Sequence, residues 1–267
     1  MSSSSLDSFY AVDSPLHRLD PRLKLVMAVL YMVSCLFVSD AATIVLAGAA
    51  IALAIALAHV PFRRIMAPIS PLLFFLLVTS LINLFFVQTG DVLFEAGPVR
   101  FTTEGVSAAV LYTVRFYFLL LAGALLMVTT TPIALTDAAE QVLAPLERIG
   151  VPVGQAMLIL SIALRFVATL AQETENIIAA QTARGADLEG KGALAFAKAC
   201  VPLIVPLFAS ALRHADNLAR AMDARCYIGN EGRTHYHVMR LSRTDALAAG
   251  VLALYLLALA ALRLLVL

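Results

Sequence analysis

Long apolar runs, broken by short polar stretches, make up most of the first half of this chain and its C-terminal end. Several runs reach the roughly twenty residues that a helix needs to cross a bilayer. Five runs are interpreted as spanning helices: Leu23–Val38, Ala41–Ala58, Ser70–Val87, Val106–Thr130 and Leu247–Leu262. Because only Ser39 and Asp40 separate the first two, those helices should form an antiparallel pair. The pattern predicts an all-α membrane protein with about five transmembrane helices.

Between residues 132 and 243 amphipathic patterns replace the apolar runs. One shorter helix precedes Gly150-Val-Pro152, and two long helices follow, separated by a polar loop at Ala186–Gly192. In the first long helix apolar residues recur at steps of three and four, namely Leu160, Leu164, Val167, Ala171 and Ile178. The second repeats this design with Leu203, Leu207, Ala211, Leu218 and Met222. We expect these helices to lie against the membrane face or against other helices.

Each long helix ends in a similar hexamer, Ala180–Gly185 in the first and Ala221–Cys226 in the second. Taken singly, Arg184 or Arg225 fits a structural role, because a cation in the last turn complements the helix dipole. Gly185 can also adopt the left-handed conformation that ends a helix. The pairing suggests a second role, since small neighbours leave each guanidinium free to bind a carboxylate on another protein.

Composition and charge distribution limit the class of protein. With 61% hydrophobic and 14% charged residues, the chain is typical of a membrane protein, and its net charge of +1 suggests no nucleic-acid partner. The Gln88–Glu104 loop is acidic, with Gly97-Pro98 at a turn, whereas basic residues flank the spans on the other side. These basic residues are Arg18, Arg22, Lys24, Arg63, Arg64, Arg240 and Arg243. We therefore expect the N-terminus and residues 132–243 in the cytoplasm and the C-terminus outside.

Groups that carry chemistry are scarce. No carboxylate and no histidine lies in the middle of an apolar run, and no phosphate-binding G-x-x-x-x-G-K-[ST] loop occurs. The His235-Tyr-His237 pair lacks a third ligand nearby, so no metal or cofactor is expected. Cys35, Cys200 and Cys226 are far apart and are interpreted as unpaired. The chain is not expected to be an enzyme.

One charged residue, Arg115, and one amide, Asn83, lie well inside the apolar runs. Arg115 is predicted to face the bundle interior and to bond to backbone carbonyls, to Tyr112, to Ser80 or to Asn83; the alternative is a contact to a substrate or partner. Asn83 is interpreted as a residue that forms hydrogen bonds between helices.

Several motifs identify a family. They are Ser14-Pro-Leu-His-Arg-Leu-Asp-Pro-Arg22, Asn83-Leu-Phe-Phe86, Thr131-Pro-Ile-Ala-Leu-Thr-Asp137, Pro145-Leu-Glu-Arg-Ile-Gly-Val-Pro152, Leu164-Arg-Phe166 and the two arginine motifs. With them, nearly the whole chain resembles the transmembrane scaffold subunit, or T component, of energy-coupling factor (ECF) importers. It is most similar to the shared type that serves several vitamin-binding partners. Cys226 departs from the pattern, because glycine is common there.

The resemblance implies a transport complex in the cell membrane. Two ATPase subunits, which bind the ATP, would dock at Ala183-Arg184-Gly185 and Ala224-Arg225-Cys226. The scaffold would pass their motion to a small vitamin-binding membrane protein, the S component. The surface expected to contact that protein comprises Leu160, Leu164, Val167, Leu203, Leu207, Ala211 and Leu218. Pro202 and Pro206 are expected to bend or interrupt the second long helix.

We expect the chain to consist of four parts. Residues 1–22 form a cytoplasmic segment, 23–131 hold four transmembrane helices, 132–243 form the coupling helices and 244–267 form the last span. Alternatives within the family are scaffolds dedicated to biotin, cobalt or nickel. A self-contained membrane carrier and a membrane enzyme are alternatives from other classes.

Overall fold

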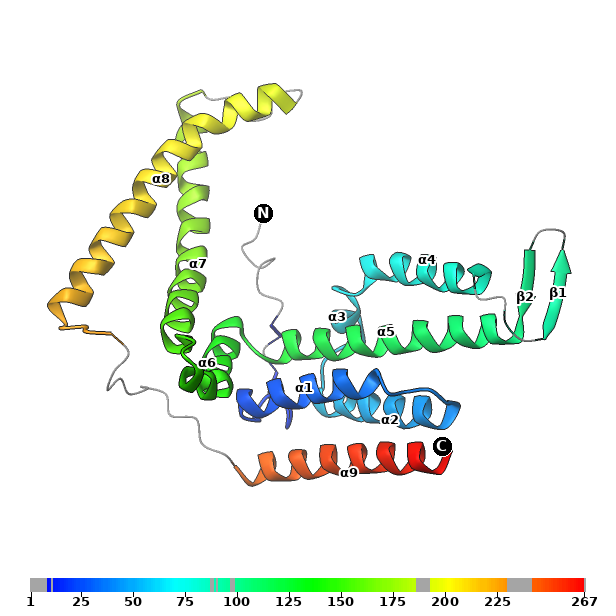
Figure 1. The fold of residues 1–267 in the computed structure, drawn as a ribbon. Helices are drawn as coiled ribbons and strands as arrows, with labels where there is room; N and C mark the ends of the chain where they lie inside the picture. Colours follow the sequence, from blue (N-terminus) through cyan, green and yellow to red (C-terminus); the bar gives the residue numbers. More distant parts are fainter. Residues whose placement is uncertain are drawn as a thin grey trace. The chain divides into compact units, whose positions relative to one another are not determined.

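The computed structural model describes residues 9–10, 12–86, 89, 91–96, 99–185, 193–229 and 242–266, with side chains except at 92–96, 99–101, 193–200 and 266. The described residues form two compact units. The bundle unit lies within residues 7–142 and 238–267, and the hairpin unit within 143–237. Both consist almost wholly of helices (Figure 1), several of them apolar and long enough to cross a membrane, so the all-α membrane class is confirmed.

Four helices of the bundle unit run side by side (Figure 1), namely α1 (Pro21–Cys35), α2 (Ala41–Ala58), α5 (Thr103–Thr129) and α9 (Arg243–Val266). Helix α4 (Ser70–Phe86) packs along α5, and the short α3 (Phe62–Met66) precedes it in the chain. Local chemistry explains where α1 begins. The Asp20 carboxylate accepts a hydrogen bond from the Arg22 amide at 2.9 Å, and Pro21 occupies the first turn, where its missing N–H costs nothing.

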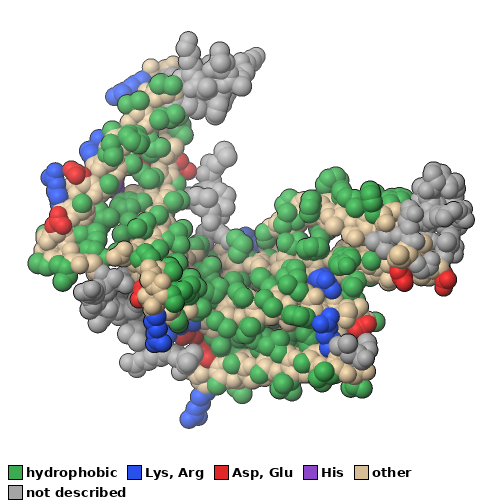
Figure 2. Space-filling view, in the orientation of Figure 1, with side chains coloured by type: hydrophobic (Ala, Val, Ile, Leu, Met, Phe, Trp, Pro, Cys, Tyr) green, Lys and Arg blue, Asp and Glu red, His purple; other side chains and the backbone are tan. Residues whose placement is uncertain are grey.

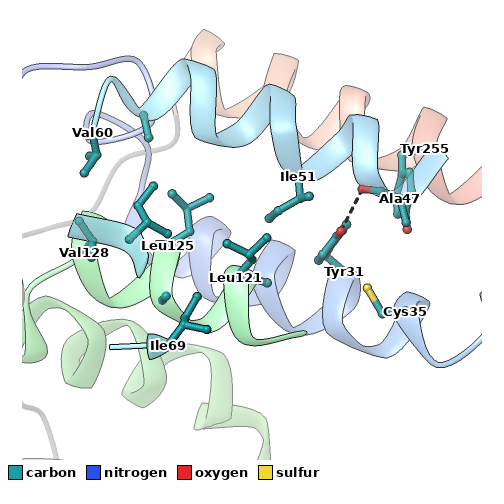
Figure 3. Packing of buried hydrophobic residues seen from close by; sticks show 14 of the residues in the cluster. Tyr31, Cys35, Ala47, Ile51, Val60, Ile69, Leu121, Leu125, Val128 and Tyr255 are labelled. Carbon is teal, nitrogen blue, oxygen red and sulfur yellow. Dashed lines mark hydrogen bonds between the residues drawn. The ribbon is translucent and has the colours of Figure 1, made fainter. Parts of the chain in front are cut away.

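Apolar side chains fill the centre of this bundle. Figure 3 shows Leu121 and Leu125 of α5 close to Ile51 of α2, within one buried cluster. The Tyr31 hydroxyl donates to the carbonyl oxygen of Ala47 at 3.0 Å and so joins α1 to α2 (Figure 3). This polar group at the centre of the bundle therefore has a partner on a neighbouring helix, as an apolar environment requires.

A buried polar network joins the residues before α1 to the ends of α5 and α9. Lys24 is 7% exposed, and its Nζ donates to the carbonyl oxygens of His17 at 3.0 Å and Thr129 at 3.2 Å. The Asp245 carboxylate of α9 accepts a hydrogen bond from the Asp20 amide at 2.9 Å. Burial and the nearby Lys24 charge lower the pKa of the His17 imidazole. Lys24, predicted as part of a basic flank, is thus an interior residue.

The predicted acidic loop contains a short β-hairpin. Strand β1 (Val92–Ala96) pairs antiparallel with β2 (Val99–Thr102). The expected turn at Gly97-Pro98 lies outside the described residues. The sequence signal for β2 is the alternation of Val99 and Phe101 with polar neighbours, which is typical of a strand. The charges of this segment favour a loop, but the alternation in residues 99–102 is the stronger indicator of its structure.

The predictions for Arg115 and for Asn83, which lie inside predicted spans, compare differently with the structure. Arg115 donates from Nη2 to the carbonyl oxygen of Val38, and its guanidinium carbon lies 5.4 Å from the centroid of the Tyr112 ring. The interpretation of Arg115 as an interior residue is confirmed. For Asn83 the prediction is wrong, because its Nδ2 donates to the carbonyl oxygen of Thr79, one turn earlier in the same helix, at 2.9 Å. A short amide side chain can reach that carbonyl without a second helix.

The hairpin unit contains the 3-10 helix η2 (Ala144–Ile149) and two long helices, α7 (Val153–Ala183) and α8 (Ala193–Ala224), which pack against each other (Figure 1). The single shorter helix predicted before them is in fact two, since α6 (Pro132–Leu143) ends where η2 begins. Glu147 of η2 accepts a hydrogen bond from the Gly154 amide at 2.9 Å. This carboxylate accepts from an amide that has no partner within α7, and its negative charge interacts favourably with the positive end of the helix dipole.

Helix α8 passes through both of its prolines without interruption. Pro202 and Pro206 lie inside the helix, and Figure 1 shows α8 changing direction in its yellow, N-terminal part. A proline removes one backbone hydrogen bond and crowds the preceding turn, which bends a helix. The expected bend is therefore present, and the alternative of an interrupted helix is wrong.

Within the described residues, four helices are long and apolar enough to cross a membrane, namely α2, α5, α7 and the Arg243–Leu265 part of α9. Helix α4 is apolar but shorter, and α1 has 15 residues. Helix α7 is an addition to the predicted spans. Its second half carries Gln172, Glu173, Glu175 and Asn176, so its apolar character belongs mainly to its first half.

Candidate functional site

The two arginine motifs have the same backbone geometry in Ala180–Gly185 and Ala221–Cys226. In each hexamer the arginine amide donates to the carbonyl oxygens of the first and second residues, at 3.2 and 3.1 Å. The residue after the arginine donates to the third residue, at 2.9 Å in both. That residue is left-handed, with φ of 85° at Gly185 and 56° at Cys226. The resemblance seen in the sequence is therefore also a structural repeat.

Cys226 occupies the position that a glycine occupies in the first hexamer. The next amide, of Tyr227, donates to the carbonyl oxygen of Met222 at 3.0 Å and completes a Schellman stop. A side chain in the left-handed region costs about 1 kcal/mol, because its Cβ approaches the backbone. The departure from glycine thus changes the energy of this turn and leaves its shape intact.

Replacing Cys226 with glycine is expected to stabilise the end of α8 by about 1 kcal/mol, because glycine adopts this conformation without a steric cost. Amide hydrogen exchange over residues 224–228 of the purified protein should slow accordingly. Gly185→Ala is the matched control and should speed exchange at the end of α7. Faster exchange in Cys226→Gly would contradict the assignment of strain to this residue.

Both arginines are available to a partner. Arg184 and Arg225 are exposed, and within the described part of the chain neither guanidinium takes part in a hydrogen bond or an ion pair. By contrast, the exposed Arg220 forms an ion pair with Asp216, four residues earlier on the same helix, at 3.0 Å. Because α7 and α8 run in opposite directions, the two motifs lie at opposite ends of the hairpin unit (Figure 1). Two separate partner sites can thus be reached at once.

The apolar residues predicted to contact an S component fall into two groups. Leu160 and Val167 on α7 are 44% and 52% exposed. The others are half-buried on helices that pack against each other: Leu164, Leu203, Leu207, Ala211 and Leu218. Sequence periodicity finds such a stripe but cannot say whether it faces a neighbouring helix or a partner.

A second apolar stripe on α8 was not predicted. Its members follow helical spacing and are between 54% and 65% exposed: Val201, Ile204, Val205, Phe208 and Leu212. In Figure 2 hydrophobic side chains lie over both α7 and α8, whereas charged side chains gather along the outer edge of α8. The sequence signal was available, since α8 carries apolar residues on more than one face around Pro202 and Pro206.

Metal and ligand chemistry are not evident in the described residues. No group of three or more His, Cys, Asp or Glu side chains among them could hold a metal ion, and the His235-Tyr-His237 pair lies outside them. A cavity of about 420 Å³ between α1, α2, α5 and α9 is lined almost wholly by apolar groups. Such a lining lacks the convergent polar groups of a vitamin or nucleotide site. Cys35 and Cys226 are free thiols.

Known proteins resemble this chain over most of its length. A family model described as "Cobalt transport protein" (CbiQ) matches residues 13–236. Proteins named energy-coupling factor transporter transmembrane protein EcfT are 38% identical in Ruminiclostridium cellulolyticum and 42% identical in Heliobacterium modesticaldum, over 91% and 90% of both chains. A putative ABC transporter ATP-binding protein of Bifidobacterium longum is 41% identical over 93% of this chain, which spans 32% of that protein.

Proposed function

This chain belongs to the CbiQ family and is a transmembrane scaffold subunit of an energy-coupling factor transporter, and we propose that the ends of α7 and α8 dock it onto two ATPase subunits. The family consists of transporter membrane subunits, not of enzymes. In this proposal Arg184 and Arg225 each insert into an acidic groove on one ATPase. The residues on either side of each arginine are small, so they let the arginine enter a narrow groove without a steric clash. They are Ala183 and Gly185 in the first motif and Ala224 and Cys226 in the second.

The observation that carries this proposal is the repeated helix end with an exposed arginine. A capping role alone would account for one such arginine, but it does not require two hexamers with matching hydrogen bonds and small neighbours on both. A guanidinium offers a planar fork that pairs with a carboxylate through two hydrogen bonds. The Bifidobacterium longum relative adds support, because it is named as a putative ABC transporter ATP-binding protein.

The second part of the proposal concerns a small membrane partner that binds the transported vitamin. We assign its contact to the exposed residues Leu160 and Val167 of α7 and to the exposed stripe on α8. Five of the seven residues expected there from the sequence are half-buried, so they offer less surface to a partner than Leu160 and Val167 do. Apolar contacts with few hydrogen bonds suit a partner that is exchanged for others. This favours the shared type of scaffold over one dedicated to biotin, cobalt or nickel.

Co-purification tests both parts. A tagged full-length chain, extracted from its native membranes in mild detergent, should bring down two ABC-type ATPases and one or more small membrane proteins. An unrelated multi-pass protein with the same tag is the control. A self-contained carrier would be recovered without ATPases and would bind its substrate alone, and that result would contradict the proposal.

A variant separates the two partner surfaces. Phe208→Asp places a charge in the exposed apolar stripe and should reduce recovery of the small membrane protein while leaving the ATPases bound. Asn217→Asp adds the same charge on the opposite side of α8, where residues are exposed and polar, and should change neither. Equal recovery of all partners with Phe208→Asp would show that the stripe has another purpose.

The proposed topology places the N-terminus in the cytoplasm, five spans in the membrane and the C-terminus outside. A single cysteine introduced near residue 97 should react with a membrane-impermeant reagent from outside, and one near residue 190 should not. The second position is decisive for α7, because a membrane-spanning α7 would bring residue 190 to the outer side. Labelling at residue 190 in intact cells would therefore overturn the five-span arrangement. Labelling of both cysteines in opened membranes is the control.

A further inference from the structure

Three polar side chains interrupt the contact between α7 and α8. The Ser210 hydroxyl donates to Oε1 of Glu173 on the opposite helix. His214 Nδ1 lies 3.0 Å from the carbonyl oxygen of Ser210, and since a carbonyl only accepts, Nδ1 carries the proton. The imidazole packs edge to face against Phe166, with ring centroids 5.8 Å apart. Phe166 belongs to the Leu164-Arg-Phe166 motif, which the docking proposal leaves unexplained.

Burying these polar groups in a contact between two helices costs free energy. Ser210 is 2% exposed, and the second oxygen of Glu173, Oε2, is buried without a hydrogen-bond partner in the described structure. A half-satisfied buried carboxylate does not stabilise a helix pair as well as apolar side chains of similar size would. The best-attested use of such a group is to fix the register of two helices.

The apolar contacts cannot fix that register by themselves. On α8 the half-buried residues Leu203, Leu207 and Ala211 follow one another at steps of four. A displacement of α8 by one turn would therefore replace each apolar side chain with another and lose little buried area. The hydrogen bond between Glu173 and Ser210 joins one residue on each helix, so a displacement of one turn would separate its donor from its acceptor by about 5 Å.

We propose that Glu173 and Ser210, supported by His214, form a register pair that holds α7 and α8 in one axial alignment and so sets the separation of the two docking arginines. Arg184 lies eleven residues beyond Glu173, about 16 Å along α7, and Arg225 lies fifteen residues beyond Ser210, about 22 Å along α8. Both segments are free of proline, since Pro202 and Pro206 precede Ser210. A slip of one turn would move the two arginines relative to each other by about 5 Å. The functional meaning of this pair rests on the proposed docking of Arg184 and Arg225.

Distance measurement between spin labels tests the register directly. Asn176 on α7 and Asn217 on α8 are exposed and can be replaced by labelled cysteines, after Cys35→Ala, Cys200→Ala and Cys226→Gly remove the native thiols. The full chain in lipid nanodiscs should give one narrow distance distribution. Ser210→Ala and Glu173→Leu should each add a second population, with an interspin distance changed by up to about 5 Å.

Glu173→Gln is the matched control, because its amide oxygen still accepts the Ser210 hydrogen bond, and it should keep the single distribution. Thermal unfolding of the same samples separates register from stability. A single, unshifted distribution in Ser210→Ala and Glu173→Leu would overturn the proposal, whether or not their melting temperatures fall. The spin-label measurement needs no ATPase, so its result does not depend on whether the two arginines dock. The docking proposal is tested separately by the co-purification experiment.

Discussion

Replacing both Arg184 and Arg225 with alanine is expected to abolish ATP-driven uptake while the subunit remains folded in the membrane. Loss of a guanidinium would leave the partner carboxylate unpaired in a desolvated groove, at a cost of about 2–5 kcal/mol for each site. Folding should be little affected, because both side chains are exposed. The interaction of a cation in the last turn with the helix dipole is worth only about 0.3–1 kcal/mol. Each single variant should retain one attachment, so uptake should fall further than ATPase recovery does.

Lysine distinguishes the two explanations of these arginines. If Arg184 and Arg225 only complement the helix dipole, Arg→Lys should be nearly silent, because the positive charge remains. If they are forks, lysine loses the bidentate geometry and should weaken ATPase recovery. Arg220→Ala is the matched control on α8, since Arg220 is exposed and paired with Asp216 in a surface contact of small energetic value. Normal assembly and uptake in the double alanine variant would leave helix capping as the better account.

Lys24→Met is expected to cause the largest loss of stability in the bundle unit. Methionine has a similar length but no ammonium, so the carbonyl oxygens of His17 and Thr129 would lose their shared donor. The carboxylates of Asp20 and Asp245 would also lose a nearby positive charge. Buried acceptors left unpaired in this way cost about 3 kcal/mol. The melting temperature of the purified subunit should fall clearly, and proteolysis near the start of α1 should increase.

Arg18→Met is the control for that substitution. Arg18 also precedes α1, but its pair with Asp13 is exposed on both sides, at 71% and 72% of the side-chain area. Solvent screens such a pair, which is worth at most about 1 kcal/mol. We expect Arg18→Met to melt close to the parent. Equal melting of Lys24→Met and the parent would mean that the network before α1 does not stabilise the bundle.

Local features of this protein could be predicted from its sequence because they depend on short stretches of chain. Apolar run length indicated α2, α4, α5 and α9, and three- and four-residue periodicity indicated the two long helices. The two arginine hexamers were recognisable because a helix stop is encoded by adjacent residues, of which Gly185 is one. The ion pair of Asp216 with Arg220 follows equally from a four-residue spacing on one helix.

Side-chain surroundings were decided by the tertiary structure, because they depend on residues far apart in the chain. In the sequence Lys24 resembles a charge at the edge of a span. In the structure its Nζ donates to the carbonyl oxygen of Thr129, which is 105 residues away in the chain, so Lys24 is an interior residue. Glu173 reads as one more polar residue on α7, but the contact with Ser210 makes it part of the helix interface. For the same reason periodicity found an apolar face on α8, and only packing against α7 separated its half-buried residues from the exposed stripe around Phe208.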